Sequence, residues 1–154
     1  MKKTVIAFIG LVLFSLSCGK TADTGCTPAT VASENSAMVA YCTANGINYI
    51  THPSGILYEI VSLGTGATPT LASRVSTVYT GKLMNNTVFD ASATPITFPL
   101  ANVIEGWKIA IPLVRAGGRI KMVIPSALAY SCVGTNGIAG NSPLFFDVTL
   151  VAVQ

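Results

Sequence analysis

Residues 103–111 read VIEGWKIAI and contain the only tryptophan of the chain, Trp107. Gly106 stands directly before this tryptophan, and Pro112 follows the segment. Neither glycine nor proline favours a helix interior, so the segment is unusual as ordinary core packing. The role of Trp107 therefore has to be sought in the sequence on either side of it.

Both flanking regions alternate between apolar and polar residues with the period of β-strands. Before the segment, strands are predicted in SGILYEIVSLGTG (54–66), in RVSTVYTGKLMNNTVFDAS (74–92), with a turn at Asn85-Asn86, and in PITFPL (95–100). After it, RAGGRIKMVIP (115–125) and SPLFFDVTLVAV (142–153) predict two more. Several antiparallel strands with one short helix late in the domain predict an α+β fold.

The apolar residues of the last two strands fall on one side of each strand. One side carries Ile120, Met122 and Ile124 in the first of them, and Leu144, Phe146, Val148 and Leu150 in the second. The other side of the last strand carries Phe145, Asp147, Thr149 and Val151.

The N-terminal third has a different character. The predicted division is a signal peptide at 1–17, a small and polar tether at 18–33, a short helix at 34–48 and the main domain at 49–154. Ser33 or Asn35 could cap the helix, and Asn45-Gly46 supplies its stop.

The first residues resemble a bacterial export signal. Lys2 and Lys3 precede an apolar run that is too short to span a bilayer, and small residues follow it. SLSC (15–18) resembles a lipobox, although Ser15 stands where leucine is preferred. Cys18 is therefore the predicted lipidation site, and the protein is expected to be exported and anchored by lipid at the periplasmic face or the cell surface. The alternative is a plain signal peptide that is cleaved nearby.

Composition excludes several classes of protein. The 154 residues are 51% hydrophobic and 10% charged, which excludes a disordered chain. No cluster of lysine or arginine could follow a phosphate backbone, so no nucleic-acid partner is expected. His52 is the single histidine and no two cysteines have ligand spacing, so no metal, cofactor or serine–histidine–aspartate triad is expected.

Three cysteines follow Cys18, so one disulfide and one free thiol is the simplest outcome. Pairing Cys26 with Cys42 is slightly favoured because they are near in sequence, and pairing Cys42 with Cys132 is the alternative. The second pairing would hold the N-terminal helix against the loop around Cys132.

Three stretches together resemble the FKBP-type peptidyl-prolyl cis-trans isomerases. They are VYTGKLMNNTVFDAS (78–92), FPLANVIEGWKIAIPLVRAGGRIKMVIPSALAY (98–130) and NSPLFFDVTL (141–150). The resemblance runs in family order from about Leu57 to Val153. It implies an antiparallel sheet curled around one short helix, and a pocket that binds proline.

The resemblance also implies a role for each matching residue. Trp107 would form the pocket floor, and the backbone N–H of Ile104 would bond a substrate carbonyl. Tyr130 would offer its hydroxyl to the substrate backbone, and Asp90 would accept a hydrogen bond from Tyr79. The pocket walls would be Tyr79, Phe89, Phe98, Val103 and Phe146, with Ile138 at the loop edge. Taken one at a time, the wall residues could instead be plain core and Asp90 a turn residue.

The chain departs from the family pattern at the pocket rim. The family usually has glycine at the position of Ser131 and prolines at Ala139-Gly140. This loop also lacks the histidine that many members carry, and it contains Cys132. The implied activity is isomerisation of X–Pro bonds in exported proteins by a monomer. A proline-peptide-binding module or chaperone with little turnover is the first alternative, and a purely structural surface lipoprotein is the second.

Overall fold

The structure is a computed structural model that describes residues 25–154. The predicted signal peptide, the lipidation site Cys18 and the first part of the predicted tether lie outside the described residues. No helix within 25–154 has the length and apolarity that a bilayer span requires.

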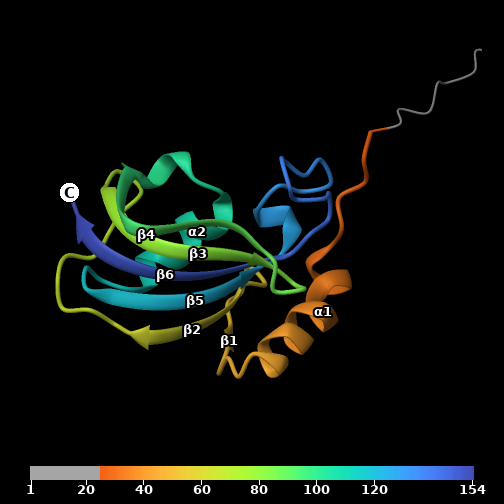
Figure 1. The fold of residues 1–154 in the computed structure, drawn as a ribbon, viewed down its shortest axis with the longest axis horizontal. Coiled ribbons are helices and arrows are strands. Elements are labelled where there is room, and N and C mark those ends of the chain that lie inside the picture. The colour runs from red at the N-terminus through yellow and green to blue at the C-terminus, as the bar shows by residue number, and fades with distance from the viewer. Residues whose placement is uncertain (1–24) are drawn as a thin grey trace, which may run out of the picture.

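One six-stranded antiparallel sheet, in the order β1-β2-β5-β6-β3-β4, organises the domain (Figure 1). The strands are β1 (Ile50–Thr51), β2 (Leu57–Ser62), β3 (Arg74–Leu83), β4 (Val88–Pro99), β5 (Gly118–Ile124) and β6 (Leu144–Val153). The helices are α1 (Val31–Ala44) and α2 (Glu105–Ala110), with 3-10 turns η1 (Leu100–Asn102), η2 (Ile111–Leu113) and η3 (Ser126–Leu128). The α+β fold predicted from the sequence is confirmed.

The two faces of the sheet carry two separate apolar clusters. On one face, neighbouring residues Leu57, Val123 and Phe145 of β2, β5 and β6 pack against α1. One residue along each strand, the side chains point to the opposite face and join the cluster that contains α2. The predicted alternation of β5 and β6 is confirmed, and it sends Phe146 to the α2 face.

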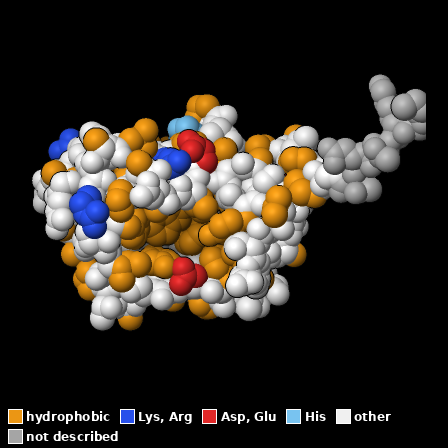
Figure 2. All heavy atoms as spheres, turned by 90° about the horizontal axis from the view of Figure 1, so that it is seen from above, with side chains coloured by type: hydrophobic (Ala, Val, Ile, Leu, Met, Phe, Trp, Pro, Cys, Tyr) orange, Lys and Arg blue, Asp and Glu red, His pale blue; other side chains and the backbone are white. Residues whose placement is uncertain are grey.

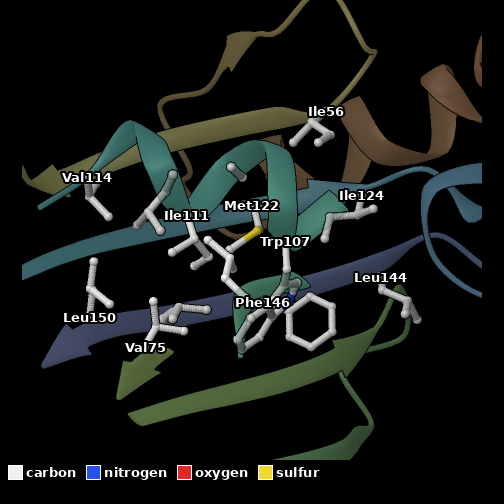
Figure 3. Close-up of a cluster of buried hydrophobic side chains, with 14 of the residues drawn as sticks. Ile56, Val75, Trp107, Ile111, Val114, Met122, Ile124, Leu144, Phe146 and Leu150 are labelled. Atoms are coloured by element: carbon white, nitrogen blue, oxygen red, sulfur yellow. The ribbon is translucent and has the colours of Figure 1, made fainter. Parts of the chain in front are cut away.

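Helix α2 lies close against the sheet because Gly106 has no side chain. A Cβ atom at Gly106 would lie 2.4 Å from Cγ2 of Ile124 on β5. Trp107, the next residue, is 4% exposed and packs beside Phe146, as Figure 3 shows. The glycine that is unfavourable for a helix is therefore the residue that allows α2 to place Trp107 in the core.

Strand β4 corrects one prediction. Residues 88–92 and 95–100 were expected to form separate strand segments, but β4 is continuous from Val88 to Pro99. Its pairing with β3 jumps from Thr77↔Ile96 to Tyr79↔Ser92, so the extra residues around Pro95 bulge out. A bulge on an edge strand tolerates proline because no ladder hydrogen bond is needed there. The predicted turn is confirmed, with Asn86 at φ 67°.

Helix α1 begins earlier than predicted. It runs from Val31 to Ala44 rather than over 34–48, and its cap is Thr30 rather than Ser33 or Asn35. Thr30 Oγ1 accepts a hydrogen bond from the N–H of Ser33, which satisfies one of the free donors of the first turn. The predicted stop is confirmed, since Asn45 ends the helix and Gly46 adopts φ 63°.

The disulfide is also different from both predicted pairings. Cys26 bonds Cys132, whereas Cys42 is a free, fully buried thiol between α1 and the sheet. The pairing predicted from nearness in sequence was wrong because Cys42 points from α1 toward the sheet. The described part of the predicted tether is held on the domain, since Asn141 bonds the backbone of Thr27 and Ala29.

The contact between Gly106 and Ile124 gives a test of this packing. We expect Gly106→Ala to destabilise the protein by about 1–3 kcal/mol, because the added methyl group overpacks the helix–sheet contact. Denaturant unfolding measures the loss. In an Ile124→Ala background, which removes the contacting atoms, Gly106→Ala should cost much less. Additive costs of the two substitutions would contradict the packing constraint.

Candidate functional site

The α2 face of the sheet opens into a pocket of about 370 Å³. Hydrophobic side chains gather in a hollow on the face seen in Figure 2, with few charged groups around it. The lining comes from β3, β4, β6, η1, the start of α2 and the loop after η3. The lining residues are Tyr79, Phe89, Asp90, Ile96, Phe98, Asn102, Val103, Ile104, Trp107, Tyr130 and Phe146.

Trp107 is held in place by three aromatic rings. Tyr79 and Phe146 meet its indole edge to face, with ring centroids 5.3 and 5.2 Å apart. Phe98 is tilted against it at 5.8 Å. Edge-to-face contacts of this kind fix ring orientation as well as burying area. The arrangement presents a rigid aromatic surface at the bottom of the pocket.

A second glycine allows the wall of the pocket to close. A Cβ atom at Gly81 of β3 would lie 2.7 Å from the Phe89 ring and 2.9 Å from the Phe146 ring. These two rings pack edge to face with centroids 5.5 Å apart. Any larger residue at position 81 would push apart the rings that form this side of the pocket.

The polar groups of the pocket are few. The hydroxyl of Tyr79 donates a hydrogen bond to Oδ2 of Asp90 at 2.6 Å. Burial raises the pKa of Tyr79, and the hydrogen bond and the negative charge of Asp90 raise it further, with a smaller contribution from Tyr130. Asp90 itself is exposed, so it lies at the rim rather than in the dry interior.

Two N–H groups lie at the pocket without a protein acceptor. Within residues 25–154, the backbone N–H of Ile104 makes no hydrogen bond to the protein. The indole Nε1–H of Trp107 is buried and also has no partner in that range. Ile104 is half-buried and lines the pocket, so a bound acceptor could satisfy its N–H, whereas the Trp107 Nε1–H lies below the surface.

The structure brings together all but one of the predicted site residues. The exception is Ile138, which does not line the pocket but is buried in the same core cluster as Trp107 and Phe146. Its loop is closed by backbone hydrogen bonds between Thr135 and Ile138. Ile96 and Asn102 line the pocket and were missed. The alternation of PITFPL puts Ile96 on the same side as Phe98, so that signal was available for the isoleucine.

The lining residues suit binding rather than covalent chemistry. They include no serine, cysteine, lysine or histidine. The carboxylate among them, Asp90, is exposed at the rim and accepts a hydrogen bond from Tyr79. No group of three or more potential metal ligands comes together within residues 25–154. The pocket can enclose a small apolar side chain and offer neutral donors to the backbone around it.

Comparison with known proteins agrees with this geometry. The family of FKBP-type peptidyl-prolyl cis-trans isomerases matches residues 66–151. The chain is 41% identical over 104 residues to the FKBP-type peptidyl-prolyl cis-trans isomerase FkpA of Aeromonas hydrophila, covering 66% of this chain and 39% of that protein. It is 39% identical over 106 residues to the outer membrane protein MIP of Legionella longbeachae, covering 66% of this chain and 46% of that protein.

Among solved structures, a peptidyl-prolyl cis-trans isomerase from Pseudomonas syringae superimposes with a TM-score of 0.69 at 31% identity. That match covers 83% of this chain and 98% of the other. The chain spans less than half of the length of the two curated relatives described above.

The hydrogen bond between Tyr79 and Asp90 can be tested by measuring the pKa of Tyr79. In Asp90→Asn we expect the pKa of Tyr79 to fall, yet to stay above its ordinary value because burial, the largest cause, remains. A raised pKa means that the folded state retains the proton, so its stability falls as pH rises above 10.0, and less steeply in the variant.

Titration of ¹³C-labelled tyrosine by NMR measures the shift. Tyr41 is the internal control, because burial raises its pKa to about 12 without a contribution from Asp90. A Tyr79 pKa that did not change in Asp90→Asn would show that the carboxylate has no influence on the pocket.

Proposed function

The chain belongs to the FKBP-type peptidyl-prolyl cis-trans isomerase family, and from this premise we propose that it catalyses rotation about X–Pro bonds. The observation that carries the proposal is the cage of aromatic rings around Trp107, which forms an apolar pocket with neutral donors at its edge. A proline ring is the apolar group that such a pocket would enclose.

The reaction requires no nucleophile. The barrier to rotation about a peptide bond is about 18–20 kcal/mol because amide resonance keeps the bond planar. Resonance places charge on the oxygen and nitrogen, and an apolar site disfavours that charge separation. A pocket that binds the twisted amide better than either planar form lowers the barrier. No covalent intermediate forms on this route.

We assign the roles as follows. Trp107 is the floor beneath the proline ring, and the walls are Tyr79, Phe89, Phe98, Val103 and Phe146, with Ile96 added to them. The N–H of Ile104 donates to a substrate carbonyl. The hydroxyl of Tyr130 donates to the substrate backbone, and Asp90 orients Tyr79. The unpartnered N–H of Ile104 supports its role, because a bound carbonyl would satisfy it.

The second candidate is a proline-peptide-binding module with little turnover. Ser131, beside Tyr130, adopts φ 52°, a left-handed conformation that a serine takes at a cost of about 1–2 kcal/mol. The rim thus departs from a glycine-containing family rim at the residue that follows a proposed substrate contact. Binding without turnover would favour this module over the enzyme.

We further propose that the protein is exported and tethered to a bacterial membrane through Cys18, so that its substrates are exported proteins. Residues 1–17 would be the signal peptide and residues 49–154 the isomerase domain of a monomer. The charged and apolar layout of the first residues supports export. A related protein named as an outer membrane protein supports a location outside the cytoplasm.

Trp107→Leu tests the pocket. We expect a folded variant with at least tenfold lower turnover of a proline peptide, because the leucine cannot replace the flat aromatic floor; losing contacts of this kind costs roughly 1.4 kcal/mol or more. A protease-coupled isomerisation assay measures turnover, and far-UV circular dichroism checks folding. Ile109→Leu, a conservative change on the same helix outside the pocket lining, is the control. Equal turnover in Trp107→Leu and the parent would remove Trp107 from the site.

Cys18→Ser tests the anchor. We expect the variant to leave the membrane fraction, because an acylated cysteine supplies about 0.8 kcal/mol per buried methylene and serine cannot be acylated in this way. Fractionation and mass spectrometry of the mature N-terminus measure the outcome. Ser17→Ala, beside the cysteine, is the control. A Cys18→Ser protein that remained entirely with membranes would count against lipidation at this residue.

A further inference from the structure

The segment that precedes the sheet is bonded to the loop that carries Tyr130. Glu34 of α1 is 7% exposed, and no lysine, arginine or histidine in residues 25–154 forms an ion pair with it. Its carboxylate instead accepts from the backbone N–H of Ser126 at 2.8 Å and from the Ser126 hydroxyl at 2.5 Å. A buried carboxylate is stable only when such donors replace water, so this contact is specific.

Ser126 connects Glu34 to the two residues that flank Tyr130. Its carbonyl accepts from the N–H of Ala129 at 2.9 Å and from the N–H of Ser131 at 2.8 Å. These are the residues immediately before and after Tyr130. Ser126 is 1% exposed, so the contact between Glu34 and Ser126 is shielded from water.

The far side of the same loop is held by the N-terminal segment as well. The disulfide joins Cys26 to Cys132, which is two residues beyond Tyr130. Oδ1 of Asn141 accepts from the N–H of Ala29 at 2.8 Å, and its Nδ2 donates to the carbonyl of Thr27 at 3.1 Å. Figure 1 shows the N-terminal segment running beside this loop on its way into α1.

The loop has a reason to need these attachments. Ser131 and Asn141 both adopt a positive φ, of 52° and 56°, and the N–H of Asn141 donates to the Ser131 carbonyl at 2.8 Å. Residues other than glycine keep such a conformation only where their surroundings hold them in it. Glu34, Asn141 and the disulfide supply that constraint from outside the pocket.

Resting on the proposed function, we propose that Glu34 and the Cys26–Cys132 disulfide are positioning elements that hold the Tyr130 hydroxyl in place over the pocket. None of these residues lines the pocket, so they act on the substrate only through Tyr130. The N-terminal segment thereby sets the affinity of the isomerase site, and reducing the disulfide weakens it.

A double-mutant cycle on the full chain tests the role of Glu34. Glu34→Ala should weaken binding of a proline peptide by about three- to tenfold, the range expected for losing one hydrogen bond. In a Tyr130→Phe background the same change should have an effect of at most about twofold, because the hydroxyl it positions is already gone. Glu34→Gln, which can still accept from Ser126, should keep most of the affinity. Asn35→Ala, an exposed neighbour on α1, is the matched control.

Reduction of the disulfide tests the proposal independently, without changing Glu34. Dithiothreitol should lower peptide affinity in the parent, but not in a Cys26→Ser/Cys132→Ser variant, whose affinity should already be low. A weakening by Glu34→Ala that is equal with and without the Tyr130 hydroxyl, together with unchanged affinity on reduction, would overturn the proposal.

Hydrogen exchange separates this proposal from the proposed function. If the parent binds no proline peptide, the proposed function is wrong, and the positioning is judged from the amide of Ser131 alone. We expect this amide to exchange faster in Glu34→Ala and after reduction, while amides of β5 stay protected. Equal protection of Ser131 in all these forms would overturn the positioning role.

Discussion

The close approach of α2 to β5 is the constraint on which the site depends. The contact between Gly106 and Ile124 leaves no room for a side chain at position 106. This close contact fixes how near Trp107 lies to the sheet. The indole then becomes the centre around which three other rings are arranged at right angles or tilted. If the helix moved outward by the width of a methyl group, the rings would lose these contacts and the pocket its floor. Helix packing and pocket geometry are therefore one and the same feature of this fold.

The pocket and the docking site of α1 lie on opposite faces of the sheet. Phe145 and Phe146 are adjacent in β6, yet one packs under α1 and the other lines the pocket. The α1 face thus anchors the N-terminal helix without occupying the site. The connection between the two faces runs past the end of β5, through Glu34 and Ser126, rather than through the core.

Strand periodicity was enough to predict most of the strands, since a period of two is read directly from residues such as Ile120, Met122 and Ile124. The resemblance to the FKBP family supplied the site residues, and the structure brings nearly all of them together. The predictions of the start of α1 and of the disulfide were wrong for one common reason. Each depends on contacts made across the fold: the cysteines of the bond lie 106 residues apart, and no local pattern encodes which of two cysteines faces the sheet.

The same wide separation bears on how the disulfide would form in the export that we propose. If the chain crossed a membrane from the N-terminus onward, Cys26 and Cys42 would emerge long before Cys132. The short loop between the first two costs little entropy to close, so the wrong bond is the one that can form early. Docking of α1 on the sheet removes Cys42 from this competition, because its thiol is then fully buried and burial raises its pKa to about 11. Docking of α1 therefore leaves Cys26 and Cys132 as the pair that can oxidise in the folded chain.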